Sequence, residues 1–172
     1  IKNSIAKVAP RFTMNRQLRD YDAKYYSPMY ERLKLLMRDD YYLVKEVASW
    51  KKRVRSAWES INVVSVSYPE LNKEVEVGNS YTAKVVLDLN ELSPDDIVVE
   101  MVVVDPSSSR SSSRRIIATQ PFTIEKTDDK VIHYTTTLIP ERSGVFEYGI
   151  RIIPTNPILP HRQDFNYVRW IE

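Results

Sequence analysis

The run Tyr81-Thr82-Ala83-Lys84-Val85-Val86-Leu87-Asp88-Leu89 alternates apolar and polar side chains, with Val86 as the one exception. Successive side chains of a β-strand point to opposite faces, so this spacing predicts a strand with one face in a core and the other in solvent. An amphipathic helix would instead place apolar residues three and four positions apart. The run therefore predicts a half-buried strand in an antiparallel sheet.

Extended runs of this kind fill the chain after residue 61. We expect seven of them, at residues 62–68, 80–89, 97–104, 115–124 with a break at Pro121, 130–139, 144–153 and 165–171. Turn-forming residues separate them, and no helical pattern lies among them, which predicts an antiparallel β-sandwich of about seven strands. Ser143-Gly144-x-Phe146-x-Tyr148 resembles the corner before the sixth strand of immunoglobulin-like domains, so we expect an immunoglobulin-like sandwich.

Helical periodicity precedes these strands. Apolar residues spaced by three and four positions predict a first helix with one buried stripe from Thr13, a plausible N-cap, to about Met37. The stripe consists of Leu18, Tyr21, Tyr25, Met29, Leu33 and Leu36. Pro28 disfavours helical geometry at Ser27 and predicts a kink or restart there. A second helix is expected from the acidic pair Asp39-Asp40 to about Trp58.

The period changes from 3.6 to 2 after Ile61, which predicts a domain boundary near residue 60. We expect a basic helical segment at residues 1–60 and the sandwich at residues 61–172. The first holds 14 Lys and Arg against 7 Asp and Glu, and the second holds 11 against 16. Opposite net charges favour docking within the polypeptide over a nucleic-acid or membrane partner.

The composition excludes several kinds of site. The chain has no cysteine, three glycines and two histidines, His133 and His161. It therefore lacks thiolate metal sites, phosphate-binding glycine loops and a three-histidine zinc site. The acidic pairs fall at predicted turns or helix starts, where turn chemistry explains them better than paired glycosidase carboxylates do. We expect no catalytic, cofactor-binding or metal-binding residue, no membrane span or signal peptide, and a cytoplasmic location by default.

Aromatic residues leave a carbohydrate-binding module open as an alternative, because a flat exposed ring can stack on a sugar. Trp50 and Trp58 share the apolar stripe of the second helix and are expected in the core. The candidate glycan contacts are Tyr41 and Tyr42, beside the acidic pair, and Trp170 near the C-terminal end.

The one low-complexity segment, residues 107–115, consists of serines and arginines. It predicts a solvated loop between the third and fourth strands. An anion-binding or phosphorylated loop is the alternative.

Several segments in order resemble the C-terminal region of the bacterial α-glucan (glycogen) phosphorylases. They are the Phe12-Thr13-x-x-Arg16 start with its following tyrosines, Trp50-Lys51-x-x-Val54-x-x-x-Trp58, Leu92-Ser93-Pro94-Asp95-Asp96-Ile97-Val98-Val99-Glu100, Ser143-Gly144 with Tyr148-Gly149-Ile150-Arg151-Ile152-Ile153-Pro154, and Val168-Arg169-Trp170. The first is similar to the segment that closes the catalytic domain in that family. The resemblance covers the whole chain.

The resemblance implies an enzyme that phosphorolyses α-1,4-glucan to glucose 1-phosphate with pyridoxal phosphate on a lysine. The family's lysine-bearing Gly-Thr-x-x-x-Lys motif has no match here. We therefore expect a non-catalytic structural or assembly appendage of such a parent enzyme. Its expected partners are the catalytic lobes of the same polypeptide, with glucan as the alternative, and an oligomer is possible through the parent enzyme.

Overall fold

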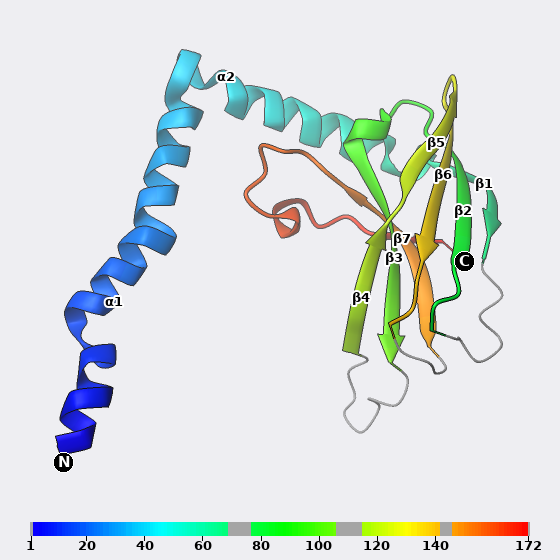
Figure 1. The fold of residues 1–172 in the computed structure, drawn as a ribbon. Coiled ribbons are helices and arrows are strands. Elements are labelled where there is room, and N and C mark those ends of the chain that lie inside the picture. Colours follow the sequence, from blue (N-terminus) through cyan, green and yellow to red (C-terminus); the bar gives the residue numbers. More distant parts are fainter. Residues whose placement is uncertain (1, 69–76, 106–114, 142–145, 172) are drawn as a thin grey trace. The chain divides into compact units, whose positions relative to one another are not determined.

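The computed structural model describes residues 2–68, 77–105, 115–141 and 146–171. It divides into two units, Ile1–Ala48 and Ser49–Glu172, and each is described by itself. The first is helical and the second is mainly β (Figure 1). No helix within the described ranges is both long and apolar enough to cross a membrane.

Helical turns occupy nearly all of the first unit. A π-helical turn Ser4–Val8 and a 3-10 turn Ala9–Phe12 precede α1, Met14–Tyr21. The predicted N-cap is confirmed, since the Thr13 side chain accepts a hydrogen bond from the backbone N–H of Arg16 at 3.3 Å. A π-helical segment, Asp22–Tyr26, then leads into α2, Ser27–Ala57. Ser27 has helical backbone angles, so the irregularity expected from Pro28 lies in the five residues before it.

The helix α2 is interrupted at the acidic pair. Asp39, Asp40 and Tyr41 have φ values of 50°, 53° and 59°, in the left-handed region, and Arg38 before them is extended. Each such non-glycine residue costs about 1–2 kcal/mol, so this is a strained left-handed turn rather than a smooth helix start. The prediction that one helical segment ends and another begins at Asp39-Asp40 is therefore confirmed. The break between them is sharper than the sequence predicted.

The apolar stripe predicted to be buried on the first helix is exposed. Leu18, Tyr21, Tyr25, Met29 and Leu33 are between 42% and 66% exposed. None of the described residues of the first unit is buried. The spacing correctly predicts an amphipathic helix. Burial of the apolar face also requires a second surface to pack against, and the described residues of this unit form only helical segments that follow one another along the chain.

Among the described residues of the second unit, eight strands form two antiparallel sheets. Figure 1 shows how the strands are arranged. They are β1 Asn62–Ser67, β2 Tyr81–Asp88, β3 Ile97–Asp105, β4 Arg115–Pro121, β5 Thr123–Asp128, β6 Val131–Leu138, β7 Glu147–Pro154 and β8 Arg169–Ile171. One sheet has the order β1-β2-β6-β5 and the other the order β4-β3-β7-β8. The prediction of a mainly β, sandwich-like architecture behind N-terminal helices is confirmed.

Two predicted strands are wrong in detail. The run at residues 115–124 is two strands, β4 and β5, which belong to different sheets. Between them Phe122 is buried and its N–H bonds to the carbonyl of Val99 at 2.9 Å, so the chain changes sheets at a buried corner. The run at residues 165–171 shrinks to the three residues of β8, because a 3-10 turn, Arg162–Phe165, occupies its start.

The core forms where the predicted inward faces meet. Ala83, Val85, Leu87 and Leu89 are fully buried, as are Ile150 and Ile152 of β7. The last turns of α2 join this core through Trp50, Val54 and Ala57, followed by Trp58 in a 3-10 turn. Burial of both tryptophans is therefore confirmed. The domain boundary near residue 60 stays a prediction, since residues 49–60 pack with the sandwich.

Paired Val→Ala substitutions test which face of the first sheet lies in the core. Val85 is fully buried, whereas Val64 is 54% exposed. We expect Val85→Ala to lower the free energy of unfolding by about 2 kcal/mol, through lost burial and a cavity. Val64→Ala should change it by less than about 0.5 kcal/mol. Urea unfolding measures both, and equal effects would contradict the assigned faces.

Candidate functional site

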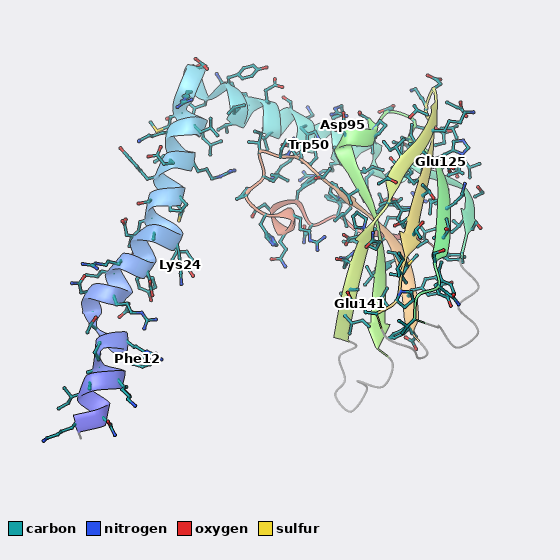
Figure 2. All side chains as sticks on the ribbon, in the orientation of Figure 1. Phe12, Lys24, Trp50, Asp95, Glu125 and Glu141 are labelled. Atoms are coloured by element: carbon teal, nitrogen blue, oxygen red, sulfur yellow. The ribbon has the colours of Figure 1, made fainter. Side chains whose placement is uncertain are left out.

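A buried carboxylate, Asp96, receives hydrogen bonds from three directions. It closes the 3-10 turn Pro94–Asp96 at the entrance to β3 and is only 5% exposed. The indole N–H of Trp50 donates to it at 2.8 Å, and the Arg53 guanidinium donates at 2.6 and 2.9 Å. The backbone N–H of Ser93 donates at 2.8 Å as the return half of a capping box. Figure 2 shows Trp50 next to the neighbouring Asp95.

The electrostatics of this cluster favour ionised Asp96. Burial alone would raise the pKa of Asp96, but the hydrogen bonds from Arg53, Ser93 and Trp50 and the charge of Arg53 hold it below its ordinary value. The hydrogen bond to Asp96 raises the pKa of Arg53 in turn. A general acid needs the opposite shift, so Asp96 is built to accept hydrogen bonds and not to deliver a proton.

A second buried carboxylate, Glu100, lies four residues further along β3. It is 5% exposed and binds two arginines. Arg151 of β7, its partner in the strand register, donates from Nε to Glu100 at 2.6 Å. Arg162 donates from Nη1 to both carboxylate oxygens, at 3.2 and 3.1 Å. Both buried carboxylates are thus held by arginine, which gives this unit fixed ion pairs instead of free acid–base groups.

Trp170, one of the predicted glycan contacts, lies beside the second cluster. It is 52% exposed and pairs with Arg151 across β7 and β8. Its ring atoms Cζ3 and Cε3 come within 3.1 and 3.4 Å of the position that a Cβ would take at Gly149. The guanidinium carbon of Arg151 is 5.6 Å from the ring centroid. The structure therefore gives Trp170 a defined, half-open position that the sequence left undetermined.

The other two predicted contacts, Tyr41 and Tyr42, belong to the first unit. They are 46% and 56% exposed, in agreement with the sequence prediction of exposed rings. Tyr41 is the last of the left-handed residues. Trp170 belongs to the second unit, and glycan contact stays a prediction for all three residues.

A surface depression of about 440 Å³ lies beside the Asp96 cluster. Its lining comes from the end of α2, the loop between β2 and β3, and the turn before β6. The polar side chains there are Arg53, Asn90, Glu91, Ser93, Asp129 and Lys130. Arg53 is already engaged with Asp96, and no aromatic ring lines the depression. These side chains carry both positive and negative charges, but they do not converge on one point as the groups of a catalytic site do.

The histidines have structural roles or surface positions. His161 caps the 3-10 turn Arg162–Phe165, accepting from the N–H of Gln163 at 3.1 Å. His133 lies 3.4 Å from Asp128 on the outward row of β6. Within the described ranges, no group of three His, Cys, Asp or Glu residues is placed to hold a metal ion.

The described lysines do not fit pyridoxal phosphate. A Schiff-base lysine is activated by desolvation, and all described lysines except the half-buried Lys51 are exposed. Lys51 donates to the backbone carbonyl of Asp164 at 3.0 Å. The described lysines therefore offer no place for this cofactor.

Three residues of these clusters were assigned no role from the sequence. One is Arg53, although it follows Trp50 by three residues and so shares a helix face with it. That spacing could have revealed it. Arg162 and Gly149 gave no local signal, because only the fold brings them to Glu100 and Trp170.

Several of the segments that carried the family resemblance, from Trp50 onward, meet in the second unit. Trp50 and Asp96 come from two of them and bond to each other, as do Glu100 and Arg151 from two of them. Arg169 from the last segment donates to the carbonyl of Ile61 at 2.6 Å. The shared residue pattern therefore records contacts that hold this unit together.

Comparison with known proteins gives the same family. Residues 58–172 match the model of the glycogen phosphorylase C-terminal domain. Maltodextrin phosphorylase of Thermococcus litoralis is 23% identical over 99% of this chain. Glycogen phosphorylases of Mycobacterium bovis and Mycobacterium tuberculosis are 24% and 23% identical, each over 98% of it. The chain spans about a fifth of the length of these relatives, between 19% and 20%.

Replacing Asp96 tests the ion-pair cluster. Asp96→Asn should lower the free energy of unfolding at pH 7 by about 2 kcal/mol, because charge-assisted hydrogen bonds are lost and an amide N–H₂ faces other donors. Asp95→Asn, at the exposed neighbour, is the control and should change little. Urea unfolding followed by tryptophan fluorescence measures both.

The pH dependence has a definite sign. The pKa of Asp96 is lower in the folded than in the unfolded state, so its stabilisation is full above about pH 4, the unfolded value, and is lost as pH falls through the folded value. The difference between wild type and Asp96→Asn should therefore shrink below about pH 4. A difference that stays constant down to pH 2 would contradict this role.

Proposed function

Because this chain belongs to the family of the glycogen phosphorylase C-terminal domain, we propose that it is the non-catalytic C-terminal portion of an α-glucan phosphorylase. In this role it supports the fold and assembly of the parent enzyme. The sandwich is proposed to be immunoglobulin-like and to begin near residue 61, with residues 1–60 as the end of the catalytic domain and the connecting helix. A cytoplasmic location belongs to the same proposal.

The parent reaction is proposed from the family. A phosphorylase of this kind uses inorganic phosphate to cleave the terminal α-1,4 bond of a glucan and releases glucose 1-phosphate. Pyridoxal phosphate would supply a phosphate group for that chemistry. Asp96 and Glu100 are occupied by arginines, and the described lysines do not suit the cofactor. The reacting groups would therefore come from the catalytic lobes of the same polypeptide.

The observation that carries the proposal is the uncovered helix face of the first unit. Its apolar side chains recur at helical spacing and stay in solvent, Leu18, Met29 and Leu33 among them. Such a continuous apolar surface marks an interaction site, since helices gain most of their stability by packing. The chain spans a fifth of its relatives, so catalytic lobes of the same polypeptide are the natural partner.

Charge supports the same partner. The first unit holds ten Lys and Arg against six Asp and Glu. Exposed charges at the rim of an apolar contact guide association and set its register more than they strengthen it. We therefore propose that the stripe supplies the affinity and the basic residues the orientation.

Recombination with the separately produced catalytic portion tests this function. In the isolated chain, amides of residues 13–37 should exchange rapidly with solvent, and adding the catalytic portion should protect them. Leu33→Ser should weaken the association by at least about tenfold, because burying a leucine contributes about 1.5–3 kcal/mol.

Lys34→Ser is the control for this experiment. Lys34 is the adjacent residue, points about 100° away around the helix and pairs with Glu31 at 2.8 Å. It should leave the association nearly unchanged. Protected helix amides in the isolated chain, or no change in exchange upon mixing, would contradict the proposed role.

A further inference from the structure

We propose that Trp170, together with Arg151 and Arg162, forms a binding platform for a neutral glucan chain on the outer face of the β4-β3-β7-β8 sheet. The polymer's identity rests on the proposed function, whereas the platform rests on the geometry of this unit. Such a site would hold substrate polymer away from the reacting groups. It is a binding role in addition to the structural one.

The platform lies on the face that points away from the core. Along β7, the buried Ile150 and Ile152 alternate with Gly149 and Arg151, which therefore face outward. Trp170 pairs with Arg151 in the register of β7 and β8, so its ring is on the same outward side. At 52% exposure, about half of the ring is left uncovered by the described residues of this unit.

Gly149 fixes the position of the ring. Two ring atoms stand within 3.1 and 3.4 Å of where a Cβ would be, so the indole rests directly over the β7 backbone. A Cβ at position 149 would make a tight contact with the ring, which would have to shift by a few tenths of an ångström. One side of the indole is therefore supported by the sheet while the remainder faces solvent, as a stacking surface requires.

The neighbouring charges are held in place before any ligand arrives. Arg151 lies 5.6 Å from the ring centroid and is bound by the buried Glu100. Glu100 is bound in turn by Arg162, whose side chain is 50% exposed. These contacts reduce the conformational entropy that the two arginines would lose on binding. Arg162 keeps further guanidinium N–H groups on the exposed side of this cluster.

This combination suits a sugar polymer. A glucose ring has apolar C–H faces that stack on an indole and a rim of hydroxyl groups that accept hydrogen bonds from guanidinium groups. Glu100 neutralises one of the two arginines, so only one net positive charge remains and the attraction for a polyanion is weakened. A protein interface buries about 800 Å² per partner and has an apolar core. A single ring bordered by ion pairs offers less apolar surface than such a core, so this surface suits a sugar better than a protein partner.

Affinity electrophoresis of the intact 172-residue chain in gels containing glycogen tests the platform. The wild type should be retarded relative to gels without polymer, and Trp170→Ala should lose the retardation. Trp170→Tyr should retain part of it, because a smaller ring remains. Gly149→Ala keeps the indole and shifts it by only a few tenths of an ångström, so it should retain most of the retardation. Thermal unfolding of each variant shows that the sandwich stays folded.

Two controls separate stacking from other causes. Ile116→Ala removes an equally exposed apolar side chain from β4 and should leave retardation unchanged. Dextran sulfate in place of glycogen reports binding of a polyanion by the arginines alone. Absence of retardation in the wild type, equal retardation of wild type and Trp170→Ala, or preference for the polyanion would each overturn the proposal.

The assembly experiment distinguishes this inference from the proposed function. Trp170→Ala should associate normally with the catalytic portion, because the recombination depends on the helix face of the first unit. If it loses that association while glycogen retardation is unaffected, the surface is a protein interface and the platform is refuted. Loss of the platform with intact recombination would leave the proposed function standing.

Discussion

The hydrogen bonds at Asp96 join the end of α2 to the start of β3, and the arrangement of the second unit depends on them. A buried carboxylate is costly unless every nearby donor is directed at it, and here an indole, a guanidinium and a backbone N–H all are. These donors come from segments more than 40 residues apart. The cluster therefore specifies one position of the end of α2 on the sandwich. Apolar packing alone is less directional and would allow several positions.

Glu100 repeats this arrangement on the outer face of the second sheet. It draws Arg162, from the connection between β7 and β8, onto β3 and holds Arg151 beside it. The two carboxylates lie four residues apart, Asp96 in the 3-10 turn before β3 and Glu100 on β3, and each is bound by arginine. In this unit both buried charges therefore serve to fix the arrangement of the chain.

The two units differ in how they satisfy their apolar residues. The second has a continuous core between its sheets, to which Trp50 and Val54 of α2 contribute. The first carries its apolar residues along successive helical segments, and none of its described residues is fully buried. A left-handed turn at residues 39–41 is retained within it despite its cost. These features fit a segment whose stable conformation is completed by a larger partner.

The sequence by itself determined the elements with a strong period. Alternation over residues 81–89 and helical spacing around Trp50 each predicted a buried face, because side-chain direction follows backbone period. Tertiary structure alone decided that the chain changes sheets at Phe122, and that Arg162 and Gly149 meet Glu100 and Trp170. These contacts join residues distant in sequence, and local pattern carries no information about which distant surfaces come together. The same limit explains the exposed stripe of the first helix: spacing shows which face is apolar, and only a partner surface decides whether that face is buried.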